Sequence, residues 1–158
     1  MKQRFLITLV FILSVTLVCL TGCQQKSSED VIRERIEALV VAAEQEQVRD
    51  FLAYFSETVQ VQKQLTKRDV GALALRYFLT HKIIKMYVNF LKIDVDDNDV
   101  SGRQPALANI NARVLLTSGP QALPQRIGLY EVSGYWQKVD GEWLIQKIDW
   151  RRLTKHKT

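Results

Sequence analysis

Residues 29–81 carry apolar side chains at the 3.6-residue spacing of α-helices. The first helix is predicted to start after Ser27 or Ser28, which can cap it, and Glu29 and Asp30 suit the positive end of its dipole. Its apolar stripe consists of Ile32, Ile36, Leu39, Val40 and Ala43. The polar residues 44–47 interrupt the stripe, so this segment predicts a break or kink.

Two further helices are predicted after the break. Val48, Phe51, Leu52 and Phe55 continue the spacing and predict a second helix. Thr66, followed three positions later by Asp69, has the pattern of a capping box and predicts the start of a third helix. The third stripe contains Val70, Leu73, Ala74, Tyr77 and Phe78, and the helix should end near His81.

From residue 82 onward the pattern favours β-strands. Residues 83–95 and 106–117 are rich in β-branched and aromatic side chains, and polar loops at 96–105 and 118–125 separate the strand-like runs. One face of the second run is uniformly apolar: Ala106, Ala108, Ile110, Ala112, Val114 and Leu116. About four long antiparallel strands are therefore expected.

Asp140 and Gly141 lie between two strand-like runs and predict a two-residue hairpin turn. The pairs that follow are Val139 with Glu142, Lys138 with Trp143, and Trp136 with Ile145. Trp136, Trp143, Ile145 and Val132 should then lie on the sheet face that the helices cover.

Two strands change phase along their length. Ile148 and Trp150 would point away from the helices unless a β-bulge near Gln146 or Lys147 restored them, and without it Lys147 and Asp149 would point under the helices. The first strand slips in the same way, from Ile84, Met86, Val88 and Phe90 to Leu91, Ile93 and Val95. Two slips predict a strongly curved sheet.

These elements together resemble the nuclear transport factor 2-like superfamily, also called SnoaL-like or cystatin-like. The resemblance covers about residues 29–153 and is carried by the hairpin WQKVDGEWLI and the helix-to-loop passage FLAYFSETVQV. It implies an α+β fold in which N-terminal helices and a curved sheet form a cone around a pocket. Members include isomerases, dehydratases, epoxide hydrolases and non-enzymatic binding or assembly domains, so the resemblance selects no function.

The N-terminal segment has the pattern of a signal peptide. Lys2 and Arg4 precede an apolar run, from residue 5 to residue 20, that is slightly short for a membrane-spanning helix. The stretch LTGC at 20–23 resembles the lipobox of bacterial lipoproteins, which implies cleavage of residues 1–22 and lipid attachment at Cys23. Residues 23–28 would be a lipidated tether, and multiple acyl chains anchor stably. Gln24, where an Asp usually marks inner-membrane retention, favours the outer membrane facing the periplasm.

Cysteine content and charge narrow the function classes. Cys19 would leave with the signal peptide and Cys23 would carry lipid, so no disulfide is expected. The remaining chain is long enough for one domain. The full chain has a net charge of +5 with its basic residues scattered, which is not a nucleic-acid-binding pattern.

Enzymes of the resembled superfamily use an acidic base with a tyrosine or an acid as oxyanion donor. The weak candidates here are Asp50, Tyr54, Tyr77, His81, Lys147 and Asp149, and none lies in a catalytic motif. Three of them also have a structural explanation: His81 closes a helix, Asp50 suits a helix dipole and Tyr54 lies on an apolar stripe. No cofactor is expected, and Trp136, Trp143 and Trp150 are expected to be core or pocket aromatics.

Two charged segments resemble known binding patterns in part. Asp97, Asp99, Ser101 and Gly102 match early positions of a calcium loop, but Ala108 occupies the place of the essential bidentate Glu, so no metal site is predicted. The basic cluster of the tail is Arg151, Arg152, Lys155, His156 and Lys157. This cluster can attract an anionic surface. Alternatively, residues 154–158 form a basic tail that stays solvated and disordered.

Two function hypotheses follow. The first is a non-catalytic module that binds an envelope protein partner or a small apolar ligand. Lipid on Cys23 would anchor this module to the membrane, and a homodimer through the sheet is an option. The second is a SnoaL-like isomerase or hydrolase with acid and base groups in its pocket. An enzyme should show a carboxylate or histidine that converges with a hydrogen-bond donor inside the cone.

Overall fold

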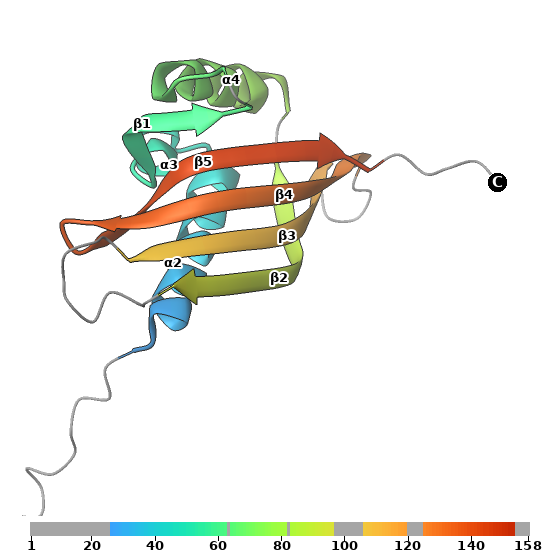
Figure 1. The fold of residues 1–158 in the computed structure, drawn as a ribbon. Helices are drawn as coiled ribbons and strands as arrows, with labels where there is room; N and C mark the ends of the chain where they lie inside the picture. The colour runs from blue at the N-terminus through green and yellow to red at the C-terminus, as the bar shows by residue number, and fades with distance from the viewer. Residues whose placement is uncertain (1–25, 63, 82, 97–105, 120–124, 154–158) are drawn as a thin grey trace, which may run out of the picture.

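The computed structural model describes residues 26–62, 64–81, 83–96, 106–119 and 125–153. Three helices and five strands follow one another along the chain (Figure 1). They are α2 (Ser28–Glu44), α3 (Val48–Leu52), β1 (Phe55–Val61), α4 (Lys67–Thr80), β2 (Lys85–Asp96), β3 (Leu107–Ser118), β4 (Gln125–Val139) and β5 (Glu142–Arg152). This is the predicted α+β class, with helices on a curved sheet.

The strands form one sheet in the order β1-β5-β4-β3-β2. Strands β2 to β5 are antiparallel neighbours, as predicted, whereas β1 joins the edge of β5 in parallel. The sheet thus has one strand more than the expected four. The hairpin register is the predicted one, with Val139 opposite Glu142, Lys138 opposite Trp143 and Trp136 opposite Ile145.

The helix starts follow the local capping chemistry. The Ser27 side chain accepts a hydrogen bond from the Asp30 backbone N–H, and Thr66 and Asp69 form the predicted capping box. Asp69 has a pKa below its ordinary value, first because its carboxylate accepts the Thr66 backbone N–H. Helix α4 ends at Thr80 with His81 as its C-cap, where the prediction placed it.

The second helix was predicted too long. Helix α3 stops at Leu52, and Phe55 begins strand β1 instead of continuing the apolar helical stripe. Both Phe55 and Ser56 are buried, because Phe55 packs in the core while Ser56 bonds to Gln146 of β5. The apolar spacing of 48–55 suits a helix, but pairing with β5 satisfies the backbone of this segment as an edge strand.

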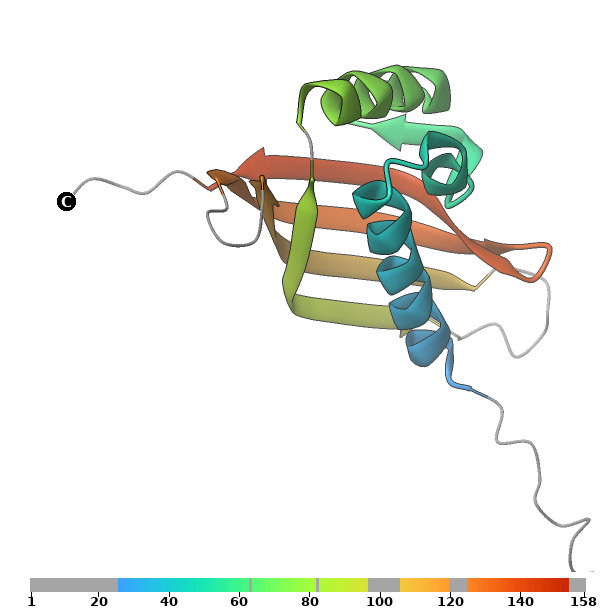
Figure 2. The same cartoon turned by 180° about the vertical axis from the view of Figure 1, so that it is seen from behind.

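Both predicted phase slips are β-bulges. The register of β4 and β5 shifts between Tyr135 and Trp136 and leaves Gln146 as the extra residue of β5. The register of β2 and β3 shifts between Asn89 and Lys92, where Phe90 has a positive φ of 51°. Strand β2 bends sharply and its first half rises toward α4 (Figure 2).

The main core lies where α2 and β1 meet the sheet. Trp143, Ile145, Ile32 and Val61 are almost fully buried there, and Trp136 lies beside them. A second cluster of Ala43, Phe78 and Ile84 joins the ends of α2 and α4 to the start of β2. Helix α2 covers the helix-facing side of the sheet at only one part of its length (Figure 2).

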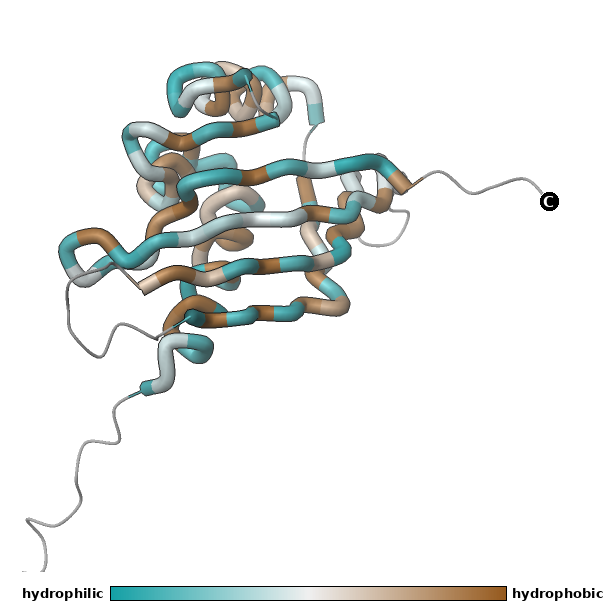
Figure 3. The backbone as a smooth tube through the Cα atoms, in the orientation of Figure 1, coloured by the Kyte–Doolittle hydropathy of each residue, from teal (hydrophilic) through white to brown (hydrophobic). Residues whose placement is uncertain are grey.

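The opposite, outer face of the sheet carries charged side chains together with the exposed aromatic residues Tyr87 and Phe90. Hydrophilic and hydrophobic residues alternate along β2 and β3 when the sheet is seen from this side (Figure 3). Ion pairs on β2 and β5 join Lys92 to Asp94 and Lys147 to Asp149. This alternation fixes which side chains can reach the interior.

Candidate functional site

The candidate site lies on the helix-facing side of the sheet, at the ends of β4 and β5 beyond α2. Val132 pairs with buried Ala112 on one side and with Trp150 on the other, so all three point to the helix-facing side. Trp150 is nevertheless 39% exposed. We call this region, with Val132, Tyr130, Trp150, Arg152 and Tyr77, the open end.

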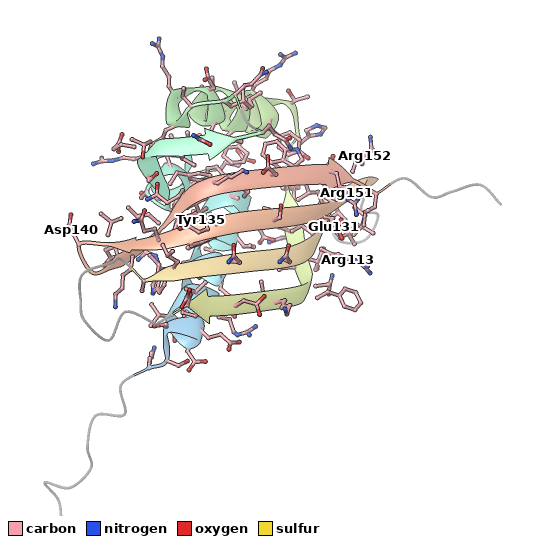
Figure 4. The ribbon with its side chains drawn as sticks, in the orientation of Figure 1. Arg113, Glu131, Tyr135, Asp140, Arg151 and Arg152 are labelled. Atoms are coloured by element: carbon pink, nitrogen blue, oxygen red, sulfur yellow. The ribbon has the colours of Figure 1, made fainter. Side chains whose placement is uncertain are left out.

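Tyr130 and Arg152 form the next cross-strand pair of the open end. They are register partners in β4 and β5, two positions beyond Val132 and Trp150 and on the same face of the sheet. The ring of Tyr130 lies along its own strand over Gly128, where a Cβ atom would come within 2.8 Å of the ring. The absence of a side chain at Gly128 therefore lets the Tyr130 ring lie against the backbone of β4. In Figure 4, Arg152 lies at the end of β5.

The last turn of α4 supplies Tyr77 and His81. The His81 backbone N–H donates to the Tyr77 carbonyl at 2.9 Å, and the two rings lie 4.5 Å apart between centroids. The Tyr77 side chain packs against the buried cluster of Ala43, Phe78 and Ile84. Its hydroxyl is buried without a hydrogen-bond partner among the described residues.

The chemistry of the Tyr77 hydroxyl follows from these neighbours. Burial raises the pKa of the Tyr77 phenol above its ordinary value of 10.0, Tyr130 adds to this rise, and the positive charge of Arg152 opposes it. The phenol is therefore a neutral donor at physiological pH. Charges on β4 and β5 thus affect the pKa of a phenol on α4.

The predicted pair Lys147 and Asp149 lies elsewhere. The bulge at Gln146 turns both residues to the outer face, where the Lys147 Nζ lies 3.6 Å from an Asp149 carboxylate oxygen. Their side chains are 47% and 32% exposed. Ile148 packs against the core in their place. This pair is an ordinary surface ion pair and does not converge with Tyr77.

The other sequence candidates are also dispersed. Asp50 is exposed in the short helix α3, and Tyr54 packs against the main core with the Arg35 guanidinium 5.3 Å from its ring centre. Of the six candidates, the structure brings only Tyr77 and His81 together at the helix-facing side. No carboxylate among those candidates joins them.

The two hairpin tryptophans fill the interior of the cone. Trp143 is 1% exposed and Trp136 is 3% exposed, and both belong to the main core. The Trp136 ring lies close over Gly134, where a Cβ atom would meet it at 3.2 Å. Large side chains therefore occupy this part of the cone, and the open end is the better candidate for a site.

Some polar groups near the core were missed by the sequence reading. Arg35 of α2 forms an ion pair with Glu142 of β5, and its Nε is buried without a partner among the described residues. The Ser56 hydroxyl donates to Gln146 at 2.8 Å. Arg35 and Ser56 had no local signal in the sequence, because their partners Glu142 and Gln146 lie far along the chain.

The outer face of α4 is unusually apolar for an exposed surface. Leu75 and Leu79 are 52% and 75% exposed, and Arg68 and Arg76 are exposed on the same helix. On the outer face of the sheet, Glu131 pairs with Arg151, next to Arg113 (Figure 4). Exposed apolar side chains occur on both surfaces, since Tyr87 and Phe90 of β2 are 50% and 77% exposed.

The described segments of the chain show neither a metal-ligating cluster nor a membrane-spanning helix. Those segments hold no cluster of three or more metal-ligating side chains, and none of their helices is long and apolar enough to cross a membrane. The calcium-loop residues Asp97, Asp99, Ser101 and Gly102 lie outside the described residues. So do Cys23 and the tail residues Lys155, His156 and Lys157.

Comparison with known structures identifies the fold. A protein of unknown function with a cystatin-like fold from Nostoc punctiforme is 14% identical, with 79% of this chain and 90% of that chain covered and a TM-score of 0.63. A nuclear transport factor 2-like protein with a cystatin-like fold from Novosphingobium aromaticivorans is 11% identical, with 89% and 88% covered and a TM-score of 0.63. A proposed scytalone dehydratase from the same species is 15% identical, with 80% and 84% covered and a TM-score of 0.65.

The chain therefore has the nuclear transport factor 2-like, or cystatin-like, fold. No model of a protein family and no curated protein sequence matches it. Identities this low establish the fold alone, and the function has to be argued from the open end.

Proposed function

We propose that this protein is a membrane-anchored, periplasm-facing lipoprotein whose domain binds a small apolar ligand at the open end without catalysing a reaction. The observation that carries the proposal is the position of Trp150, which lies on the helix-facing side of the sheet and yet is 39% exposed. A large aromatic surface left open on the concave side of a sheet is typical of a ligand site.

The neighbours of Trp150 support a binding site more than an active site. Val132, Tyr130, Met86 and Tyr77 are all part-buried. These side chains give an apolar lining with few polar groups, as in small-molecule sites. An isomerase or hydrolase would need an acid or base that converges there, and the candidate carboxylates Asp50 and Asp149 lie elsewhere. Likeness to a proposed dehydratase supports the enzymatic alternative only through the shared fold.

The anchor is argued from the sequence. The stretch LTGC at 20–23 follows a charged start and an apolar run, the pattern of a lipoprotein signal, and lipid on Cys23 would hold the domain at the membrane. Helix α2 begins at Ser28, only five positions after Cys23. The tether is therefore short, and the domain should lie close to the membrane surface.

Binding can be tested on a chain that starts at Gln24, which keeps every residue of the described fold. Decanol, a neutral apolar probe, should bind saturably and shift the emission of Trp150, as measured by fluorescence and calorimetry. Val132→Lys places a charge at the open end and should abolish binding, because a charged group in an apolar site opposes the ligand. The matched control is Ser133→Lys, one position along on the outer face, which should bind decanol normally.

Equal binding by wild type and Val132→Lys, with both proteins folded by circular dichroism, would place the ligand elsewhere and overturn the proposed site. No binding of any apolar probe would overturn the ligand function. The protein-partner alternative would then be favoured, with the outer face of α4 around Leu75 and Leu79 as its exposed apolar surface.

A further inference from the structure

Helix α4 carries apolar side chains on two opposite sides. On its inner side, Val70, Ala74 and Phe78 pack into the two core clusters. On its outer side, Leu75 and Leu79 lie one turn apart and are 52% and 75% exposed. A helix on the surface of a monomer normally turns polar side chains to water. The outer leucines therefore indicate a surface that another molecule covers.

Two arginines lie beside the outer leucines. The outer side of α4 presents, at helical spacing, five exposed residues that we call the α4 stripe: Arg68, Ala72, Leu75, Arg76 and Leu79. The stripe thus combines an apolar centre with two guanidinium groups at its flanks.

The carboxylates next to the α4 stripe already have partners. Asp69 is the acidic residue of α4, and its carboxylate accepts from the Thr66 backbone N–H at 2.9 Å and from the Thr66 hydroxyl at 2.7 Å. Glu57 of the neighbouring strand β1 pairs with the Lys67 Nζ at 2.8 Å. The stripe therefore presents net positive charge to a partner.

This combination favours a helix with carboxylates as the partner. Leucines at helical spacing pack against the apolar ridge of another helix. Guanidinium groups bind carboxylates through strong, charge-assisted hydrogen bonds. A second copy of this chain would bring the same net positive charge, and like charges oppose association.

The position of α4 argues against a membrane as the partner. Helix α4 lies at the end of α2 that is far from the start of α2 (Figures 1 and 2). A lipid on Cys23, as proposed above, would hold the start of α2 at the membrane. The α4 stripe would then face away from the lipid headgroups.

We propose that the α4 stripe binds an acidic amphipathic helix of a partner protein. The apolar side chains of that helix pack on Leu75 and Leu79, and its carboxylates pair with Arg68 and Arg76. One face of a 14-residue helix is about 21 Å long, so the interface is small and the complex is reversible. The inference does not depend on ligand binding at the open end, because the stripe lies on the outer side of α4.

The test uses synthetic helical peptides of the same length as α4. All carry the same leucine stripe, and the positions that flank it are glutamate, glutamine or lysine. Their binding to the chain that starts at Gln24 is measured by fluorescence anisotropy. The glutamate peptide should bind saturably, about tenfold more tightly than the glutamine peptide, and the lysine peptide should bind most weakly.

Variants assign this binding to the α4 stripe. Leu79→Ser should weaken the glutamate peptide about tenfold, because it removes the most exposed apolar contact. Arg76→Glu should weaken the glutamate peptide and strengthen the lysine peptide, a reversal that a loss of folding cannot produce. The matched controls are Val139→Ser and Lys138→Glu, exposed positions of the β4–β5 hairpin, and both should bind as wild type does.

The inference is overturned if the glutamate peptide does not bind, if all peptides bind equally, or if Leu79→Ser binds like wild type. Two further measurements identify the other possible occupants. Binding to phosphatidylglycerol vesicles that Leu79→Ser abolishes, without binding of the glutamate peptide, would assign the stripe to lipid. A dimer in analytical ultracentrifugation that Leu79→Ser dissociates would assign the stripe to a second copy, and either result would replace the proposed partner.

Discussion

Trp143 and Trp150 show how two tryptophans at opposite ends of one strand acquire different roles. Both lie on the helix-facing side of β5, yet Trp143 is 1% exposed and Trp150 is 39% exposed. The difference arises from what covers them, because the main core formed by α2 and β1 lies over Trp143. Trp143 therefore contributes to stability, whereas Trp150 is available to a ligand.

Replacing Trp143 by alanine should lower the free energy of unfolding by about 3–5 kcal/mol, the usual cost of truncating a buried aromatic side chain. Chemical denaturation of the chain that starts at Gln24 gives this value. Trp150→Ala is the comparison and should cost clearly less, because part of its surface is already in water. A loss below about 1 kcal/mol for Trp143→Ala would contradict the packing described here.

At the residue scale the sequence predicted burial better than it predicted the site. The alternation of β3 identified its buried side correctly, from Ala108 to Val114. The ion pair of Arg35 with Glu142 was not predictable, because the two residues are far apart in the sequence and no local pattern relates them. Chemistry that depends on tertiary proximity leaves no periodic signal in one sequence.

At the scale of elements, the β-bulge of β5 decides which charges enter the cone. Its presence was predictable, since Ile145, Ile148 and Trp150 cannot share one face of a regular strand. Strand β1 was not predictable in the same way. Its first residue Phe55 continues the apolar spacing of α3, and only pairing with β5 makes the segment a strand.

Deleting Gln146 should abolish cooperative folding. Without this residue the strand beyond it shifts by one position, so Lys147 and Asp149 would turn under the helices while Ile148 and Trp150 would turn outward. Burying two charges without compensating contacts costs several kcal/mol each. Thermal and urea unfolding followed by circular dichroism measure the effect.

Gln146→Ala is the matched control for the deletion. It keeps the extra residue and loses only the hydrogen bond from Ser56, so it should cost about 1 kcal/mol. If the deletion variant unfolded cooperatively with stability close to that of wild type, the bulge would not be the feature that keeps Lys147 and Asp149 out of the cone.

At the scale of the whole molecule, the start of α2 and helix α4 lie at opposite ends (Figures 1 and 2). Helix α2 has 17 residues and is about 25 Å long, and α3 and α4 lie near its end (Figures 1 and 2). A lipid on Cys23 would therefore hold the start of α2 at the membrane. The exposed leucines of α4 would then project away from the membrane surface, where an envelope protein could reach them.

Cys23→Ala should block lipid attachment and cleavage, so the precursor should keep residues 1–22. The physical reason is that the thiol of Cys23 is the predicted attachment atom, and several acyl chains are needed for stable anchoring. Cells grown with a radioactive fatty acid should label the wild-type protein and leave the variant unlabelled. Cys19→Ala is the matched control, because Cys19 lies in the apolar run of the signal and should not affect labelling. Label that persists on Cys23→Ala would overturn the lipoprotein assignment, and the short tether would then give no reason to place α2 beside a membrane.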